Sequence, residues 1–573
     1  MKEYATSRSE QHLLAFHRLH QEIESGVVNE AHLALLENSE NIFQTMPLAE
    51  AFRTAPPQRI RKPVEPARLE KTALVARPAA RPLHIAMVCP EIGPFAKTGG
   101  LADMVSSLAL ALERLGQRLT LMMPAYRAVL GNGLPLGDTG TRVAVSVAGR
   151  QEEAQILTAT LGHQIPVYFI RADRYFDRDY LYATPEGDYP DNAERFSFFA
   201  HAALEVLGRI DLPDILHAHD WQAALAIALL RTQPERYPGL ASARTVFTIH
   251  NLGYQGLFSP REWHVLGLDP SLFNPQCLEF YGNINFLKGG LVFAESMTTV
   301  SPTYAREIRT AEYGFGLEGI FQQRAANLAG ILNGVDYDIW NPAVDRYIAQ
   351  QYVPGDPSGK RVCKADLQSI FGLTPDPDIP LIGIVSRLAS QKGFDLVRSV
   401  LDPLFQRNVQ FVILGTGDKQ YEDCFREAAL RYRGKTGVRI AYEESLAHKI
   451  VAGADMFLVP SRYEPSGLTQ LYSLKYGTIP IVRATGGLKD SVEDFDPATG
   501  KGTGFRFEAY ETAALLGAIG RAVAAFGDKK QWAALMTNAM SADYSWNRSA
   551  LEYLALYKRL AGQRGLIKDI EPA

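Results

Sequence analysis

The chain has 573 residues, more than one hydrophobic core ordinarily spans, so we expect two or more domains. Its 59 Lys and Arg residues against 63 Asp and Glu residues give a formal net charge of −4, which speaks against nucleic acid as a partner but allows a local phosphate site. No apolar run approaches the roughly 18 residues of a membrane span, and the N-terminus lacks a signal peptide's apolar stretch. These features favour a soluble cytoplasmic protein with no membrane partner.

The four cysteines are widely separated and form no C-x-x-C pair, so the sequence predicts neither a zinc site nor a disulfide framework. This usage fits a reduced cytosol. We expect no cofactor and no metal.

Residues 1–81 are predicted to be an appendage. Apolar residues recur at roughly helical spacing between Ser7 and Arg53, and a Pro- and Arg-rich stretch that reads as an extended connector follows. His12, His17 and His20 have no carboxylate or cysteine at matching spacing, so a solvated helix face is favoured over a metal site.

From residue 82 onward, short apolar strands alternate with helical segments, which is typical of a doubly wound parallel sheet. The first series of strands is "LHIAMVCP", "QRLTLMMP", "IPVYFI", "DILHAHD" and "ARTVFTIHN". The pattern restarts at "PLIGIVSRL" and continues through "VQFVILGTG", "VRIAYEE", "DMFLVPS" and "IPIVRAT". The sequence therefore predicts two Rossmann-like α/β domains, at residues 82–328 and 329–543.

Each predicted domain carries the motif Thr-Gly-Gly-Leu-x-Asp, at Thr98–Asp103 and Thr485–Asp490. A glycine pair ahead of a helix lets backbone N–H groups approach an anion at the positively polarised helix end. Ligands of doubly wound sheets bind beyond the carboxyl ends of the strands, where both loops are expected. We interpret the doubled motif as two loops facing one ligand.

Charged side chains are expected at the same strand ends. Arg387 and Lys392 follow one strand, Lys97 precedes the first glycine pair, and His219 ends another strand within "HAHDW". Glu464 lies in a turn before a helix, where helix-end N–H groups would keep its carboxylate ionised. Each residue alone is more often a surface ion pair or a core side chain, but together they would bind a diphosphate and place an acid near its reactive end. A nucleotide-sugar donor fits.

Two D-x-D patterns, at Asp336–Asp338 and Asp494–Asp496, match a motif of metal-dependent sugar transferases. Both lie in turn-like segments, so ordinary loop structure is favoured.

Several long motifs resemble the bacterial glycogen synthase and plant starch synthase family, in order, from about Leu83 to Leu560. They include "KTGGLADM", "HAHDWQAALA", "TIHNLGYQGLF", "GILNGVDYDIWNP", "VSRLASQKGFDL" and "SRYEPSGLTQLYSLKYGTIPIVRATGGLKD". The resemblance implies the GT-B arrangement, with two Rossmann-like domains around a central cleft. It also implies transfer of glucose from ADP-glucose to the nonreducing end of an α-1,4-glucan with retention. The helix within 544–573 is expected to pack back on the first domain.

The same resemblance implies roles for individual residues. Arg387 and Lys392 would clamp the diphosphate, His219 would hydrogen-bond the transferred sugar, and Glu464 would lie beside the glucosyl ring. The other substrate-binding candidates lie in the donor loops, the sugar site and the turn around Glu464: Lys97, Gly99, Gly100, Asp103, Asp191, Asn333, Ser466, Gly467, Leu468, Thr485, Gly486, Gly487 and Leu488. The leaving phosphate is expected to accept the acceptor's proton on the same face of the sugar.

Two positions depart from related patterns. Ser466 stands where family members usually carry Cys, and Tyr472 stands where sucrose synthases have a second Glu, which favours the glycogen and starch synthase branch. The aromatic-rich segment "RYFDRDYLYATPEGDY" is either core or a stacking surface for glucan.

Three other functions fit parts of the sequence. A retaining transferase of the same architecture could use UDP-glucose or a small acceptor, since the residues do not reveal the base. A catalytically silent glucan-binding or regulatory protein is suggested by Ser466 and the appendage, and opposed by the intact charged residues. A glycogen phosphorylase would be distinguished by a pyridoxal phosphate lysine. The oligomeric state is not predicted.

Overall fold

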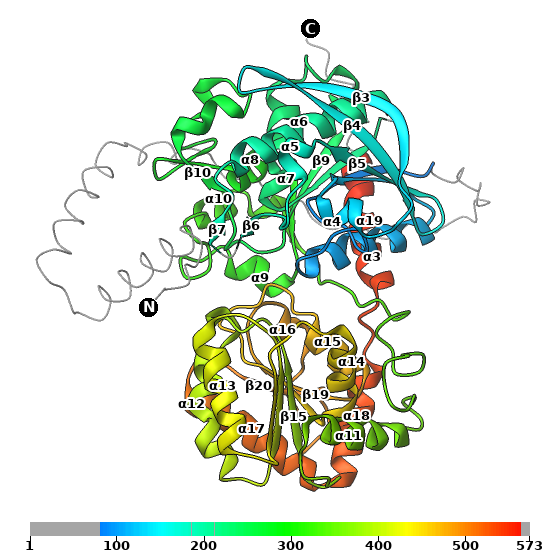
Figure 1. Ribbon diagram of the computed structural model, residues 1–573, viewed down its shortest axis with the longest axis vertical. Helices are drawn as coiled ribbons and strands as arrows, with labels where there is room; N and C mark the ends of the chain where they lie inside the picture. The colour runs from blue at the N-terminus through cyan, green and yellow to red at the C-terminus, as the bar shows by residue number, and fades with distance from the viewer. Residues whose placement is uncertain (1–80, 185, 211, 563–573) are drawn as a thin grey trace, which may run out of the picture. The chain divides into compact units, whose positions relative to one another are not determined.

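The computed structural model describes residues 81–184, 186–210 and 212–562 (Figure 1). The helices expected before Arg53, the connector and the three histidines of the appendage lie outside the described residues. Within the described ranges, no helix combines the length and apolar character needed to cross a membrane.

The first sheet has nine strands and contains the predicted parallel order. Seven neighbouring strands pair in parallel, because each is followed by a helix or a long loop that returns the chain to the same edge. In spatial order the strands are β14 (Leu328–Gly330), β13 (Ser296–Thr299), β9 (Arg244–Ile249), β8 (Ile215–His219), β1 (His84–Val88), β2 (Arg118–Pro124), β5 (Ile165–Arg171), β4 (Arg150–Leu161) and β3 (Gly137–Val147).

One edge of this sheet differs from the prediction. Strands β3 and β4 form an antiparallel hairpin that extends the sheet beyond β5, and neither was predicted. In β3, buried Val143, Val145 and Val147 alternate with more exposed residues, the pattern of a strand with one covered face. Because β3 and β4 are polar and only half buried, they lack the continuous apolar runs that identified the inner strands.

Helices and short strands surround the first sheet. The helices are α3 (Gly100–Arg114), α4 (Arg127–Gly131), α5 (Asp173–Phe176), α6 (Asn192–Ile210), α7 (Asp220–Thr232), α8 (Phe286–Phe293), α9 (Pro302–Glu307) and α10 (Glu318–Gln323). The short strands are β6 (Ala183–Thr184), β7 (Gly187–Asp188), β10 (Leu257–Phe258), β11 (Glu279–Phe280) and β12 (Asn283–Asn285).

The second sheet has six strands, all parallel, in the order β17 (Thr436–Arg439), β16 (Gln410–Leu414), β15 (Leu381–Val385), β18 (Met456–Val459), β19 (Ile479–Arg483) and β20 (Phe505–Phe507). The strand expected at 438–444 ends at Arg439. The remaining helices are α11 (Ser358–Phe371), α12 (Phe394–Phe405), α13 (Lys419–Arg431), α14 (Glu444–Gly453), α15 (Thr469–Lys475), α16 (Gly486–Ser491), α17 (Thr512–Gly527), α18 (Lys529–Ser541) and α19 (Trp546–Gly562).

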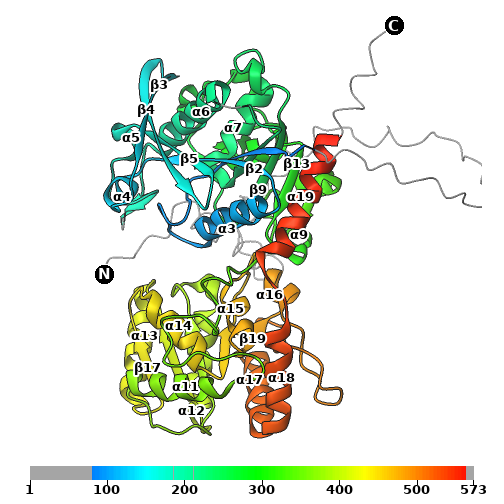
Figure 2. The same cartoon turned by 90° about the vertical axis from the view of Figure 1, so that its right-hand side faces the viewer.

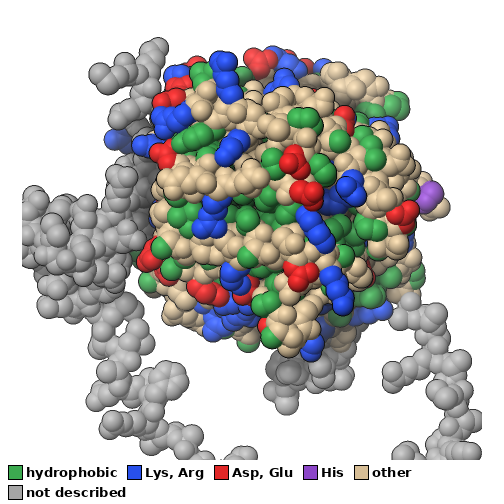
Figure 3. Space-filling model, turned by 90° about the horizontal axis from the view of Figure 1, so that it is seen from below, with side chains coloured by type: hydrophobic (Ala, Val, Ile, Leu, Met, Phe, Trp, Pro, Cys, Tyr) green, Lys and Arg blue, Asp and Glu red, His purple; other side chains and the backbone are tan. Residues whose placement is uncertain are grey.

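Alternate residues of the second sheet enter two separate cores. Ile382 and Ile384 pack with α12 and α17 on one face, whereas Leu381 packs with α11 and α14 on the other. Burying each of these aliphatic side chains stabilises the fold by about 1.5–3 kcal/mol. On the face drawn in Figure 3, Lys and Arg side chains are interspersed with Asp and Glu rather than gathered together.

The last described helix, α19, packs against α3 of the first sheet's layer (Figure 2). Its buried Tyr553 and Tyr557 belong to the core around that sheet. The Tyr557 hydroxyl lies 2.8 Å from His217 Nδ1 on β8, so the end of the chain contacts a strand 340 residues earlier.

Candidate active site

A cavity lies where the strand order of the second sheet reverses. From β15 the chain continues to β16 on one side and later to β18 on the other, and side chains after β15 and β18 line the cavity. Such a switch point at the carboxyl ends of strands is the usual ligand site of an open α/β sheet. At about 190 Å³ the cavity is smaller than a pocket for a whole drug-sized ligand, so it would hold only part of a nucleotide sugar.

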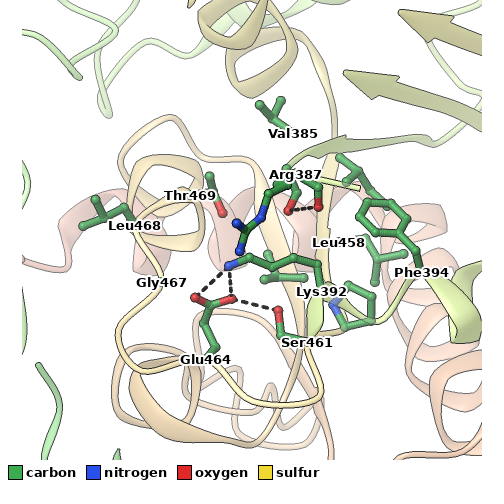
Figure 4. Close-up of a pocket in the computed structure, with 14 residues that line it drawn as sticks. Val385, Arg387, Lys392, Phe394, Leu458, Ser461, Glu464, Gly467, Leu468 and Thr469 are labelled. Carbon is green, nitrogen blue, oxygen red and sulfur yellow. Dashed lines mark hydrogen bonds and ion pairs between the residues drawn. The ribbon is translucent and has the colours of Figure 1, made fainter. Parts of the chain in front are cut away.

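Lys392 and Glu464 form an ion pair in this cavity. Lys392 Nζ donates to both Glu464 carboxylate oxygens, at 2.9 and 2.7 Å, and Ser461 Oγ donates to the same carboxylate at 2.8 Å (Figure 4). The Glu464 side chain is only 8% exposed, so its charge is compensated mainly by these two donors. The expectation that helix-end N–H groups hold this carboxylate is not met, since α15 begins five residues later, at Thr469.

Arg387 enters the cavity beside Lys392, with the two cations on one side and Glu464 opposite (Figure 4). Its Nη2 also lies 3.4 Å from the hydroxyl of Tyr254, a residue of the first sheet's layer. Gly467 and Leu468 line the same cavity. The structure thus brings together five of the predicted residues from two separate segments of sequence.

The first glycine loop lies at the corresponding position of the first sheet, after β1, whose neighbours β2 and β8 diverge in chain order. Thr98 donates its N–H and hydroxyl to the buried carboxylate of Glu91, at 2.5 and 2.6 Å. Sequence reasoning missed Glu91, which no motif marks. Lys97 pairs with Asp103 at 2.7 Å. Burial alone would lower the pKa of Lys97, but Asp103, with Tyr442 and Glu444, outweighs burial and raises it.

Gly99 and Gly100 differ in their surroundings. A Cβ added at Gly99 would meet no atom within 4 Å, whereas one at Gly100 would lie 3.2 Å from Leu468 Cδ1. The backbone at Gly99 is therefore open to a ligand.

His219 ends β8 with a fully buried ring. Its Nδ1 lies 3.1 Å from His250 Nε2, and burial, reinforced by His217 and His250, lowers its pKa well below the ordinary value. The imidazole is therefore neutral at physiological pH. The next residue, Asp220, has φ +56°, and its carboxylate accepts the His250 N–H at 2.7 Å; burial raises the pKa of Asp220 to about 7.

Three predicted substrate-binding or catalytic residues share one feature: each has a buried polar atom without a hydrogen-bond partner. These atoms are His219 Nε2, Asn333 Oδ1 and Ser466 Oγ. Buried polar atoms are nearly always paired in native proteins, so these three can accept or donate a further hydrogen bond. Eleven other buried side-chain atoms of the described residues share this state. Asp191 differs, since Arg178 pairs with its carboxylate at 2.5 and 2.8 Å.

The second glycine loop has its N–H groups occupied by protein atoms. Gly486 donates to the carboxylate of Glu307 at 3.0 Å, and Gly487 donates to the carbonyl oxygen of Glu464 at 3.1 Å. A Cβ at Gly486 would lie 1.9 Å from the Glu464 carbonyl oxygen, and one at Gly487 would lie 1.9 Å from that of Ser466. These glycines allow two backbone segments to pack closely, unlike Gly99.

Other candidates lie elsewhere. Lys97, His219, Asp191 and Asn333 do not line the cavity around Glu464. The D-x-D segments make loop contacts: Asp336 accepts the N–H of Asp338, and Asp494 pairs with Arg521. Within the described ranges, no group of three or more His, Cys, Asp or Glu side chains could hold a metal ion.

Comparisons with known proteins give one consistent relationship. Residues 84–323 match the family described as "Starch synthase catalytic domain", and residues 368–532 match "Glycosyl transferases group 1". Residues 1–49 match a family described as "1,4-alpha-glucan branching enzyme, C-terminal". A glycogen synthase of Koribacter versatilis is 48% identical over 83% of this chain and 98% of its own length. A glycogen synthase of Syntrophotalea carbinolica is 45% identical over 83% of this chain and 99% of its own length.

Among solved structures, the catalytic domain of starch synthase IV from Arabidopsis thaliana, bound to ADP and acarbose, matches with a TM-score of 0.77 and 35% identity. The match covers 84% of this chain and all of that one. A sucrose-phosphate synthase from Thermosynechococcus elongatus, 18% identical with a TM-score of 0.52, shares the fold.

Two Rossmann-like sheets, with charged side chains at the switch point of the second, together with the match to glycosyl transferases, define a GT-B glycosyltransferase. The chain belongs to the glycogen and starch synthase family.

Proposed function

We propose that the protein is a glycogen synthase that transfers glucose from ADP-glucose to the nonreducing end of an α-1,4-glucan with retention of configuration. The observation that carries this proposal is the cavity at the second switch point, where Arg387 and Lys392 lie opposite Glu464. ADP as the nucleotide is supported by its presence in the related starch synthase structure.

In this proposal some residues stabilise the leaving group and others stabilise the sugar. Arg387 and Lys392 bind the diphosphate and stabilise the charge that develops on it as the glycosidic bond breaks. The leaving phosphate oxygen accepts the proton of the acceptor hydroxyl on the same face of the ring, which preserves the configuration. Glu464 supplies a fixed negative charge beside the developing oxocarbenium ion.

The sugar is held by the groups that lack protein partners. His219 Nε2, Asn333 Oδ1 and Ser466 Oγ are buried and unpartnered, so sugar hydroxyls would complete their hydrogen bonding. The first glycine loop approaches the donor at Gly99, with Lys97 beside it. We further propose that residues 82–328 and 329–543 are the two catalytic domains, that 544–573 return to the first, and that the protein acts in the cytoplasm.

The test uses donor labelled in its glucose. Full-length protein is incubated with glycogen and either ADP-glucose or UDP-glucose, and the labelled glucan is digested with β-amylase, which removes maltose from nonreducing ends. Label transferred from ADP-glucose and released as maltose supports the proposal. Preferential use of UDP-glucose would assign another donor, and transfer that requires glucose 1-phosphate and pyridoxal phosphate would make the protein a phosphorylase.

A further inference from the structure

Helices α9 and α16, both labelled in Figure 2, cap each other with carboxylates. Asp490 on α16 accepts the hydroxyl of Ser301 at 2.7 Å, the N–H of Thr303 at 2.8 Å and the Thr303 hydroxyl at 2.6 Å, all at the start of α9. Glu307, the last residue of α9, accepts the Thr485 hydroxyl and the Gly486 N–H, each at 3.0 Å, at the start of α16. We call this arrangement the reciprocal cap.

The reciprocal cap satisfies groups that a helix start otherwise leaves unpaired. The first N–H groups of a helix have no intrahelical partner and carry partial positive charge, so a carboxylate there is favourable. The side chain of Asp490 is only 15% exposed, which strengthens its charge-assisted hydrogen bonds. The reciprocal cap therefore holds the start of α16 in place against α9.

From α16 the contacts continue directly to the turn that carries Glu464. The Gly487 N–H donates to the carbonyl oxygens of Glu464 and Pro465, at 3.1 and 3.2 Å. Gln470 Nε2 joins the carbonyl oxygen of Ser466 to the hydroxyl of Ser491 at the end of α16, each at 3.1 Å. Hydrogen bonds from α16, the helix that Glu307 caps, thus hold the backbone of the turn that carries Glu464.

We propose that Glu307 and Asp490 are positioning residues for glucosyl transfer, which act by holding α16 against the backbone of residues 464–466. Neither residue touches the donor in this scheme. This inference rests on the proposed function for its effect on turnover, while its structural half is independent of the reaction.

The experiment compares Glu307→Ala and Glu307→Gln with a matched control, Asp528→Ala. Asp528 also caps a helix, accepting two backbone N–H groups at the start of α18, at 3.1 Å each. Hydrogen–deuterium exchange is measured on peptides covering 461–470 without substrate, and kcat and the donor KM are measured with ADP-glucose and glycogen.

Glu307→Ala is expected to speed exchange at 461–470 and to lower kcat by about tenfold or more with donor KM within about threefold, because misplaced catalytic groups cost mainly turnover. Glu307→Gln retains an acceptor for the Gly486 N–H and should recover kcat to within about threefold of wild type. Asp528→Ala should leave both the exchange at 461–470 and the kinetic constants unchanged.

Unchanged exchange at 461–470 in folded Glu307→Ala would overturn the proposal, as would wild-type kcat per folded molecule. If Glu307→Ala does not fold, Asp490→Ala tests the other half of the reciprocal cap by removing all three accepted hydrogen bonds: faster exchange and lower kcat support the proposal, and wild-type values of either overturn it. An inactive wild-type protein would refute the proposed function, yet the exchange experiment would still decide the structural link.

Discussion

The ion pair between Lys392 and Glu464 makes two predicted roles interdependent. A sequence reading assigns Lys392 to the diphosphate and Glu464 to the sugar, but the two side chains are joined at 2.7 and 2.9 Å. A donor phosphate would share the Lys392 ammonium with the carboxylate. Lys392 therefore both binds the leaving group and compensates a buried charge.

Glu464→Gln tests the carboxylate's part in the reaction. The amide keeps the shape and removes the charge, so stabilisation of a developing oxocarbenium ion is lost in the transition state and much less in the ground state. We expect kcat to fall about 10²–10³-fold, or about 2.7–4 kcal/mol, with ADP-glucose affinity changed by less than about tenfold. Steady-state kinetics measure kcat, and calorimetric titration with ADP-glucose in the absence of acceptor measures the affinity. Near wild-type turnover would remove Glu464 from the mechanism.

Lys392→Ala and Arg387→Ala should separate catalysis from stability. Both should lower kcat about 10²-fold or more, because each removes a preorganised cation at the leaving phosphate. Only Lys392→Ala leaves the Glu464 carboxylate buried without its cation, so it should also cost about 1–3 kcal/mol of unfolding free energy. Denaturant unfolding of both variants gives the comparison. Equal stability losses would show that the ion pair does not stabilise the fold, and an increase in KM alone would make both cations uniform binding groups.

At the scale of elements, the two Thr-Gly-Gly loops share a sequence and differ in their surroundings. Gly99 is open on the side where a Cβ would lie, whereas Gly486 and Gly487 are pressed against the backbone of the Glu464 turn. The interpretation that both glycine pairs face the ligand stays a prediction, and the structure shows only that the two pairs have different surroundings. Gly486 and Gly487 are glycines because two backbone segments pack so closely there that a side chain would not fit.

Gly487→Ala and Gly99→Ala form a matched pair that tests this difference. The methyl group at Gly487 would lie 1.9 Å from the Ser466 carbonyl oxygen, so the turn must move. We expect Gly487→Ala to lower the unfolding free energy by about 1–3 kcal/mol and to lower turnover. At Gly99 the methyl group has space, so unfolding free energy should change by less than about 1 kcal/mol, while donor affinity falls. Similar stability losses in the two variants would contradict the assignment.

Much of the site was predictable because its charged residues directly follow recognisable apolar strands in the sequence. Arg387, Lys392 and Glu464 follow apolar strands, so the rule that parallel strands end at one edge predicts from sequence alone that they lie together. His250 and Glu91 also follow predicted strands, β9 and β1, but neither was singled out, because no second charged residue lies beside them in the sequence. Glu307 could not be found this way, since it ends a helix and acts through partners on another element. The β3–β4 hairpin was missed for a similar reason: its half-buried strands lack a continuous apolar run.

At the scale of the molecule, the part of the chain that aligns with two relatives spans nearly their full length. Two glycogen synthases align over 98% and 99% of their lengths with 83% of this chain, and the catalytic domain family match begins at residue 84. The chemistry is therefore expected to reside in residues 81–562.

Deletion of residues 1–80 should leave turnover on short maltooligosaccharides within about threefold of the full chain, because no residue assigned to the site lies in that segment. The full-length protein and the shortened one are compared at equal folded concentration. A hundredfold loss in a folded protein would assign the segment a part in catalysis.

The most direct measurement follows ADP release and chain length together in one reaction. Purified full-length protein is mixed with ADP-glucose and a maltooligosaccharide of defined length, with Arg387→Ala as the matched blank. We predict that each ADP released is accompanied by one added glucose on the oligosaccharide, and that the variant loses about 10²-fold or more of both signals. No elongation by the wild-type protein, or undiminished elongation by Arg387→Ala, would contradict glucosyl transfer at this cavity.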